Sequence, residues 1–178
     1  MIQFTDITSL QVMLAPEQGP DITSEIVASL EAILAAKGTL FSSQYSFSDQ
    51  AVAAAMNACW QASPDGVGLF DGSCAAESDD NARAVQAATA GVDASRWAVG
   101  CMPGQMIVHD KVFCDPVTGN VFTGSFNLTS SAEREANNAV FVTSVSMAQF
   151  FAAEIARNLP IVKANPYSRP PWRSSAKP

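Results

Sequence analysis

The chain has 178 residues, 48% of them hydrophobic and 15% charged, which is typical of one folded domain and excludes an intrinsically disordered chain. Residues 1–160 contain all 17 acidic residues and six basic ones, a net charge of −11, whereas residues 161–178 carry four basic residues and no acid. A body this acidic repels polyanions at long range, which argues against a general nucleic-acid-binding protein.

Hydrophobic spacing predicts strands alternating with helices in the first half of the chain and several consecutive strands in the second half. Asp21, Ser48 or Asp49, and Ser146 are the expected helix-capping residues, and Gly38 is expected at the C′ position that ends the first helix. The expected strands are 11–15, 40–47, 67–70, 97–101, 105–114, 120–126 and 138–143; the expected helices are 22–34, 49–61, 81–89 and 146–159, with a polar loop at 71–80. This order predicts an α/β sandwich with a mixed, mostly parallel sheet flanked by helices.

A change of composition divides the chain into two parts. Residues 1–160 are expected to form the folded domain, and residues 161–178 a Pro-rich basic C-terminal arm. The arm is either a solvated tail or a basic tether for nucleic acid or for a partner subunit.

Four cysteines, Cys59, Cys74, Cys101 and Cys114, are widely spaced and accompanied by a single histidine. They contain no CxxC pair, so the sequence does not indicate a zinc site, and buried reduced thiols are expected. No apolar run approaches the roughly 20 residues of a membrane span, and the first residues lack the features of a signal peptide. A cytoplasmic protein without integral membrane association is therefore expected.

The informative stretch runs from Ile107 to Asn127. His109 and Lys111 are two apart on an expected strand, so they share one face, and Ser125 and Asn127 share a face of the next strand. The segment 115–120 has the composition of a tight turn, which would make the two strands antiparallel neighbours. An imidazole, an ammonium group, a hydroxyl and a carboxamide on adjacent apolar strands suit a tetrahedral phosphate, whose oxygens need donors and charge neutralisation. Asp110, between His109 and Lys111, is expected on the opposite face.

The pattern His109-x-Lys111, Asp115, Gly124-Ser125-x-Asn127 resembles the HxK…D…GSxN signature of the phospholipase D superfamily, and it is most similar to the small single-motif bacterial endonucleases. Similarity also covers Tyr45-Ser46-Phe47, Asp71-Gly72 and Asn138-Ala139-Val140. Two departures are present: Lys111 and Asp115 are separated by three residues where the family has four, and Asn137 occupies a position where single-motif members often carry a glutamate.

The resemblance implies a metal-independent phosphodiesterase without a cofactor, most simply a nuclease. One histidine would attack phosphorus to form a phosphohistidine while a second protonates the leaving oxygen. The chain has only one histidine, so this chemistry requires a homodimer with both motifs facing one groove. Lys111 and Asn127 would hold the phosphate oxygens, and Ser125 would donate to the phosphate or to its neighbour. Supporting residues would be Asp115, Tyr45, and either Glu133 or Glu135 in place of the family glutamate.

Two alternatives remain open at this point. One is a phospholipase D-type lipid phosphodiesterase, although Trp60, Trp97 and Trp172 form no obvious membrane-facing stripe. The other is a catalytically weak phospholipase D-like module that binds phosphate-containing ligands or a partner protein. The residue at position 137 and the short lysine-to-aspartate spacing favour this second alternative, and the complete His, Lys, Ser and Asn set argues against it.

Overall fold

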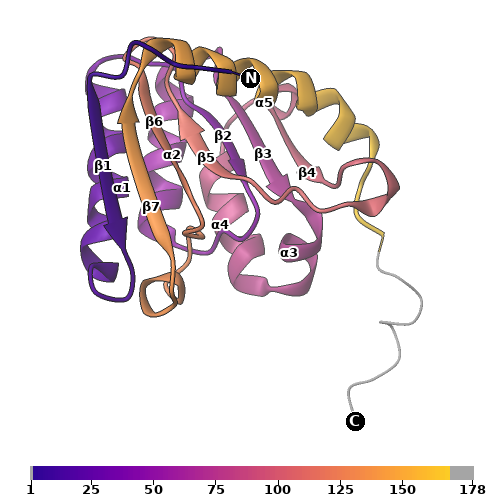
Figure 1. Cartoon of the computed structure of the whole chain (residues 1–178). Helices are drawn as coiled ribbons and strands as arrows, with labels where there is room; N and C mark the ends of the chain where they lie inside the picture. The colour runs from indigo at the N-terminus through magenta and orange to yellow at the C-terminus, as the bar shows by residue number, and fades with distance from the viewer. Residues whose placement is uncertain (1, 169–178) are drawn as a thin grey trace.

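The computed structural model describes residues 2–168, and Figure 1 shows a single sheet with helices on both of its faces. The strands are β1 (Ser9–Leu14), β2 (Phe41–Gln44), β3 (Val67–Asp71), β4 (Trp97–Gly100), β5 (Lys111–Cys114), β6 (Asn120–Gly124) and β7 (Asn138–Thr143). The α-helices are α1 (Gly19–Ala35), α2 (Gln50–Ala62), α3 (Gly72–Glu77), α4 (Asp79–Thr89) and α5 (Val145–Ala164). The α/β sandwich expected from the sequence is thus confirmed.

The sheet is mixed but mostly antiparallel, so the expectation of a mostly parallel sheet is wrong. Its order is β1-β7-β6-β5-β2-β3-β4, and only the β2–β3 and β3–β4 pairs are parallel. The parallel part comes from the helix crossovers of the first half of the chain. The second half uses direct strand connections such as the β5–β6 turn, which can join only antiparallel neighbours, and β1 adds antiparallel to β7.

Helices cover both faces of the sheet (Figure 1), and a layer of buried apolar side chains lies between the helices and the sheet on each face. On one face, α1, α2 and α4 bury side chains such as Ile26, Trp60 and Phe113. On the other face, α5 packs over the strands through residues such as Ala148 and Ile155. Because strand side chains alternate between faces, neighbours in β5 belong to different layers: Phe113 lies in the first and Val112 in the second.

Local capping explains where several helices begin and corrects four expectations. Asp21 does not cap α1, because this helix begins at Gly19 and Asp21 lies within its first turn. Asp49 caps α2 by accepting from Val52 N at 3.0 Å, as one of the expected alternatives. The segment 71–80 is not a loop, because Asp71 caps the short helix α3. Ser144, not Ser146, caps α5 by accepting from Met147 N. At the end of α1 the left-handed residue is Lys37 (φ 55°), not Gly38. Gly38 is needed for space, since a Cβ there would lie 2.1 Å from the Asp115 carboxylate.

The division at residue 160 changes in detail, because α5 continues through Pro160 to Ala164. Residues 165–168 then run beside the end of β4, where Cys101 N donates to Asn165 O at 2.8 Å. The first residues of the expected arm are therefore part of the fold, whereas residues 169–178 lie outside the described part.

All four cysteines are free thiols, and Cys59, Cys101 and Cys114 are buried as expected. Burial raises the pKa of the Cys59 thiol to about 11 and that of Cys114 to about 12. Within residues 2–168, no helix combines the length and the apolar character that crossing a membrane requires.

Candidate phosphate site at the edge of the sheet

His109 and Lys111 lie where the chain enters β5, at the same edge of the sheet as the ends of β2 and β6. The expected strand 105–114 begins only at Lys111, and His109 belongs to the irregular segment before it. The Lys111 side chain folds back on this segment: its Nζ donates to His109 O at 2.9 Å and lies 3.3 Å from His109 Nε2. The two groups therefore meet directly, and the imidazole itself is exposed.

Three hydrogen bonds hold the segment that carries His109. The Asp71 carboxylate accepts from Val108 N at 2.7 Å, and Tyr45 N donates to Asp110 O at 2.8 Å. Asp110 turns its side chain to Ser43, whose Oγ donates to it at 2.9 Å. Asp110 thus has a structural partner away from the imidazole, consistent with the opposite face expected for it.

Tyr45 completes a compact trio with the histidine and the lysine. Its ring centroid lies 4.7 Å from that of His109, with the two rings tilted by 53°. Lys111 Nζ lies 4.8 Å from the same tyrosine ring. The aromatic ring therefore restricts the orientation of both groups, and its face offers Lys111 a favourable cation–π contact.

Lys111 is a nearly buried cation, with only 7% of its surface exposed. Burial lowers the pKa of its ammonium group, and Asp110 and Cys74 oppose this effect. No carboxylate among the described residues lies within ion-pair distance of it. A desolvated ammonium without a counter-ion is stabilised by an incoming anion, which is the property that a phosphate site needs.

The position of Ser125 depends on Gly124, the glycine that ends β6. Gly124 has φ +146°, and a Cβ there would lie 2.4 Å from Asn138 O, so this position excludes a side chain. Beyond it, Ser125 Oγ accepts from Asn138 N at 2.9 Å, and Ser125 N donates to Asn138 Oδ1 at 3.1 Å. The hydroxyl is exposed and keeps its own hydrogen for another acceptor.

Asn127 is placed against the end of β2, since the next residue, Leu128, bridges to Phe47 and accepts from Ser48 N. Its Oδ1 is buried without a hydrogen-bond partner, and the same is true of Gln44 Oε1. Gln44 pairs with Lys111 across β2 and β5, so their side chains lie on one face. Two buried carbonyl oxygens without donors mark this edge as a polar site and not simple core.

The structure does not bring all the expected supporting residues to this place. Asp115 is buried in the β5–β6 turn, where it accepts from Thr39 N, Val117 N and Thr118 N. Asp115 lies four positions after Lys111, about 13 Å along an extended strand, so its role is to hold the turn. The turn itself is as expected, with Asp115 N donating to Asn120 O.

Neither candidate glutamate is hydrogen-bonded to His109. Glu133 accepts from Thr23 Oγ1 of α1 at 2.5 Å, and Glu135 is exposed. Asn137, at the position of the family glutamate, donates through Nδ2 to Ala132 O at 3.2 Å. Among the described residues, the imidazole thus contacts Lys111 and Tyr45 and is hydrogen-bonded to no carboxylate.

Three further residues shape the site and were missed by sequence reasoning: Asp71, Asn138 and Gln44. Asp71 and Asn138 were seen only as part of the family resemblance, and their contacts with Val108 and Ser125 are long-range. Gln44 ends β2, whose sequence FSSQ is mostly polar, so its polarity did not distinguish it from its neighbours. The described residues contain no cluster of His, Cys, Asp and Glu able to hold a metal ion.

Comparison with known proteins identifies the fold. No protein-family model and no curated protein sequence matches the chain significantly. Among solved structures, the chain is similar to Nuc, a phospholipase D family member from Salmonella typhimurium, with a TM-score of 0.67, 22% identity, and coverage of 84% of this chain and 92% of that one. NucT from Helicobacter pylori has a TM-score of 0.67 and 11% identity, covering 85% and 97%. A polyphosphate kinase from Porphyromonas gingivalis has a TM-score of 0.57 and 13% identity, covering 91% of this chain and 27% of that one. The chain therefore has the fold of the phospholipase D superfamily.

Proposed function

We propose that this protein is a metal-independent phosphodiesterase that hydrolyses nucleic-acid phosphodiester bonds in an active site shared by two copies of the chain. The observation that carries this proposal is the contact at 3.3 Å between His109 Nε2 and the ammonium of Lys111, which is nearly buried and has no carboxylate partner among residues 2–168. The similarity of the fold to Nuc and NucT supports the reaction class.

The proposed reaction has two steps. In the first, His109 attacks phosphorus, an N–P bond forms and the bond to the leaving oxygen breaks, and that oxygen takes a proton from the partner subunit's His109. In the second, the partner's His109 takes a proton from water, whose oxygen attacks phosphorus; the N–P bond breaks, which frees His109 and releases the phosphomonoester. Lys111 neutralises the non-bridging oxygens, and Ser125 and Asn127 donate to them.

The dimer is proposed because one imidazole cannot serve on both sides of phosphorus and the chain contains a single histidine. Exposed apolar side chains lie next to it: Met106 is 62% exposed and Ile107 is 43% exposed. Large apolar groups beside an exposed catalytic imidazole are suited to an interface that closes over it.

The other exposed apolar strip lies on β1 and is a poor route to a shared site. Leu10 and Val12 are 62% and 56% exposed on this edge strand. A two-fold axis at β1 would leave the two β5 strands seven strand spacings apart, about 34 Å. The proposed two-fold axis therefore passes near Ile107 and not near β1.

One observation favours a second function, a phospholipase D-like module that binds phosphate groups with little turnover. No carboxylate hydrogen-bonded to His109 is found in the described part of the chain, and Asn137 is occupied with a backbone carbonyl. Such a module keeps the phosphate affinity of Lys111 but lacks an efficient base for the second step.

The test of activity uses single-stranded DNA, RNA and bis-p-nitrophenyl phosphate with EDTA present, comparing wild type with His109→Ala and with Gln86→Ala on the far helix α4 as control. Hydrolysis by wild type and the control but not by His109→Ala supports the enzyme. Because His109 is the only histidine, its imidazole NMR signal also reports phosphate binding without turnover. A phosphate-dependent shift without hydrolysis supports the binding module. If neither hydrolysis nor a shift is observed, both proposals are overturned.

The shared site is tested by co-refolding wild type with inactive His109→Ala in varied ratios. If each active site needs both histidines, activity follows the square of the wild-type fraction, about one quarter in an equal mixture. A linear dependence, about one half, refutes the shared site. Ile107→Asp provides a second measurement: we expect a monomer in light scattering with greatly reduced activity, and a fully active monomer contradicts the proposal.

A further inference from the structure

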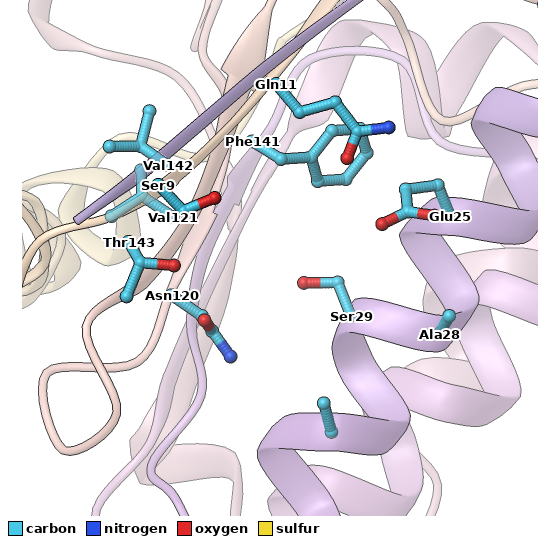
Figure 2. Close-up of a pocket in the computed structure, with 11 residues that line it drawn as sticks. Ser9, Gln11, Glu25, Ala28, Ser29, Asn120, Val121, Phe141, Val142 and Thr143 are labelled. Atoms are coloured by element: carbon cyan, nitrogen blue, oxygen red, sulfur yellow. The ribbon is translucent and has the colours of Figure 1, made fainter. Parts of the chain in front are cut away.

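A polar cavity lies at the opposite end of the sheet from His109, between α1 and the strands β1, β6 and β7. Its volume is about 250 Å³, and Figure 2 shows side chains from the helix and from the strands directed into one space. The cavity includes Asn120 at the start of β6, whereas Ser125 of the phosphate site follows the other end of the same strand. The two sites are therefore separate.

The cavity exists because small and polar residues replace the apolar ones that close the rest of this layer. At the end of the sheet nearer the phosphate site, Met13 and Ala139 are buried in the core below α1. At the cavity end, β1 and β7 present Ser9, Gln11 and Thr143 to α1. The helix contributes equally small groups there, Ala28, Ser29 and Ala32, so α1 does not fill the space.

The polar groups of the cavity are not engaged with the protein. Glu25 and Ser29 of α1 and Gln11, Asn120 and Thr143 of the strands all reach the cavity, as Figure 2 shows. None of their side chains makes a hydrogen bond or ion pair with another residue in the part of the chain that the structure describes. With the Ser9 hydroxyl, which also makes no such bond, five neutral groups and one carboxylate are thus available to a ligand, and Phe141 contributes an aromatic surface.

The charges of the cavity select the class of ligand. Glu25 is half-buried and is the only charged residue in the lining, which contains no Lys, Arg or His. The net charge of −7 adds a long-range attraction for cations. One carboxylate with a few neutral oxygens is too little for Ca²⁺, which takes 6–8 oxygen ligands. An ammonium group fits better, because it needs one counter-charge and a few acceptors, and Phe141 can add a cation–π contact.

We propose that this cavity is a binding site for a small organic ammonium ion, held by the Glu25 carboxylate and by the oxygens of Gln11, Ser29 and Asn120. The volume corresponds to that of roughly eight water molecules, which limits the ligand to a small amine. Putrescine, a diamine with six heavy atoms, is a suitable probe. One ammonium group pairs with Glu25, and the second reaches the strand-side acceptors or solvent at the open mouth.

The experiment is calorimetric titration of the full chain with putrescine and with 1,4-butanediol, a neutral molecule of the same length. Glu25→Gln removes the charge in the cavity, and Glu31→Gln removes the same charge from an exposed position of the same helix outside the lining. We expect putrescine to bind wild type and Glu31→Gln within twofold, at least tenfold weaker binding by Glu25→Gln, and no binding of the diol.

A second variant, Ala28→Phe, fills the cavity from an exposed helix position and should abolish putrescine binding while circular dichroism shows an unchanged fold. Equal affinities for Glu25→Gln and Glu31→Gln would show that putrescine responds only to the acidic surface, and this result overturns the site. Absence of binding to wild type, or undiminished binding to Ala28→Phe, overturns it as well.

Discussion

Asp71 provides the sharpest test of how the site is positioned. It is 1% exposed and gathers its hydrogen bonds from two segments. One oxygen, Oδ1, accepts from Ser73 N and Cys74 N at the start of α3 and from the Ser73 hydroxyl. The other oxygen, Oδ2, accepts from Val108 N at 2.7 Å, one residue before His109. The carboxylate therefore connects the end of β3 to the segment that carries the imidazole.

The change Asp71→Asn acts on only half of this arrangement. The amide oxygen can keep the three donors of α3, but its NH₂ group would face Val108 N–H, donor against donor. Loss of a charge-assisted bond and an unsatisfied buried N–H cost about 2–3 kcal/mol of unfolding free energy together. Because the freed segment leads directly into His109, a displacement on the order of 1 Å is expected to lower kcat by about 100-fold.

The assay combines urea unfolding with kcat and KM for bis-p-nitrophenyl phosphate at a temperature where every variant is folded. KM should change little, since the strand pairing of β5 with β2 still holds Lys111. Ser73→Ala is the control: it removes one donor to Oδ1 and leaves the Val108 contact intact, so stability falls while kcat is retained. Equal kcat values for Asp71→Asn and Ser73→Ala would refute the positioning role. The His109 NMR signal gives the same comparison without turnover.

Three further outcomes follow from the site. Burial lowers the pKa of Lys111 below the ordinary lysine value of 10.5, so phosphate affinity is present below the lowered pKa and is lost as pH rises through it. Lys111→Arg should remove this loss at alkaline pH, because arginine stays charged. Phosphate titration followed by the His109 NMR signal measures both affinities. Asp115→Ala should cost about 3–5 kcal/mol in urea unfolding by leaving buried N–H groups unpaired, yet leave kcat of the folded fraction unchanged; a large loss of kcat would place Asp115 in the chemistry. Gly124→Ala should lower both stability, by about 1–3 kcal/mol, and activity, because its Cβ meets Asn138 O. The matched Gly119→Ala, strained at the other end of β6, should lower stability alone, and equal kcat values for the two variants would contradict this reasoning.

The sequence by itself determined the features that depend on neighbouring residues. The strand 138–143 has the expected bounds, Asp49 caps the second helix, and the turn after Asp115 joins two antiparallel strands. His109 and Lys111 meet because they are two residues apart, and that spacing is visible in the sequence. Periodicity, capping and turn chemistry act over a few residues, so they can be read without the fold.

Tertiary structure alone decided how distant segments complete the site. The direction of the strands depends on which edges pair, so the antiparallel majority of the sheet could not be deduced from the order of the elements. The hydrogen bond from Val108 to Asp71 spans 37 residues, and the pair of Ser125 with Asn138 spans 13. Asp115 is a case in which the folded chain removes an expected contact. Its place in the motif suggested a role beside His109, but its carboxylate accepts hydrogen bonds from backbone N–H groups of the β5–β6 turn. A buried polar group takes the nearest donors in space, and only the folded chain determines which donors those are.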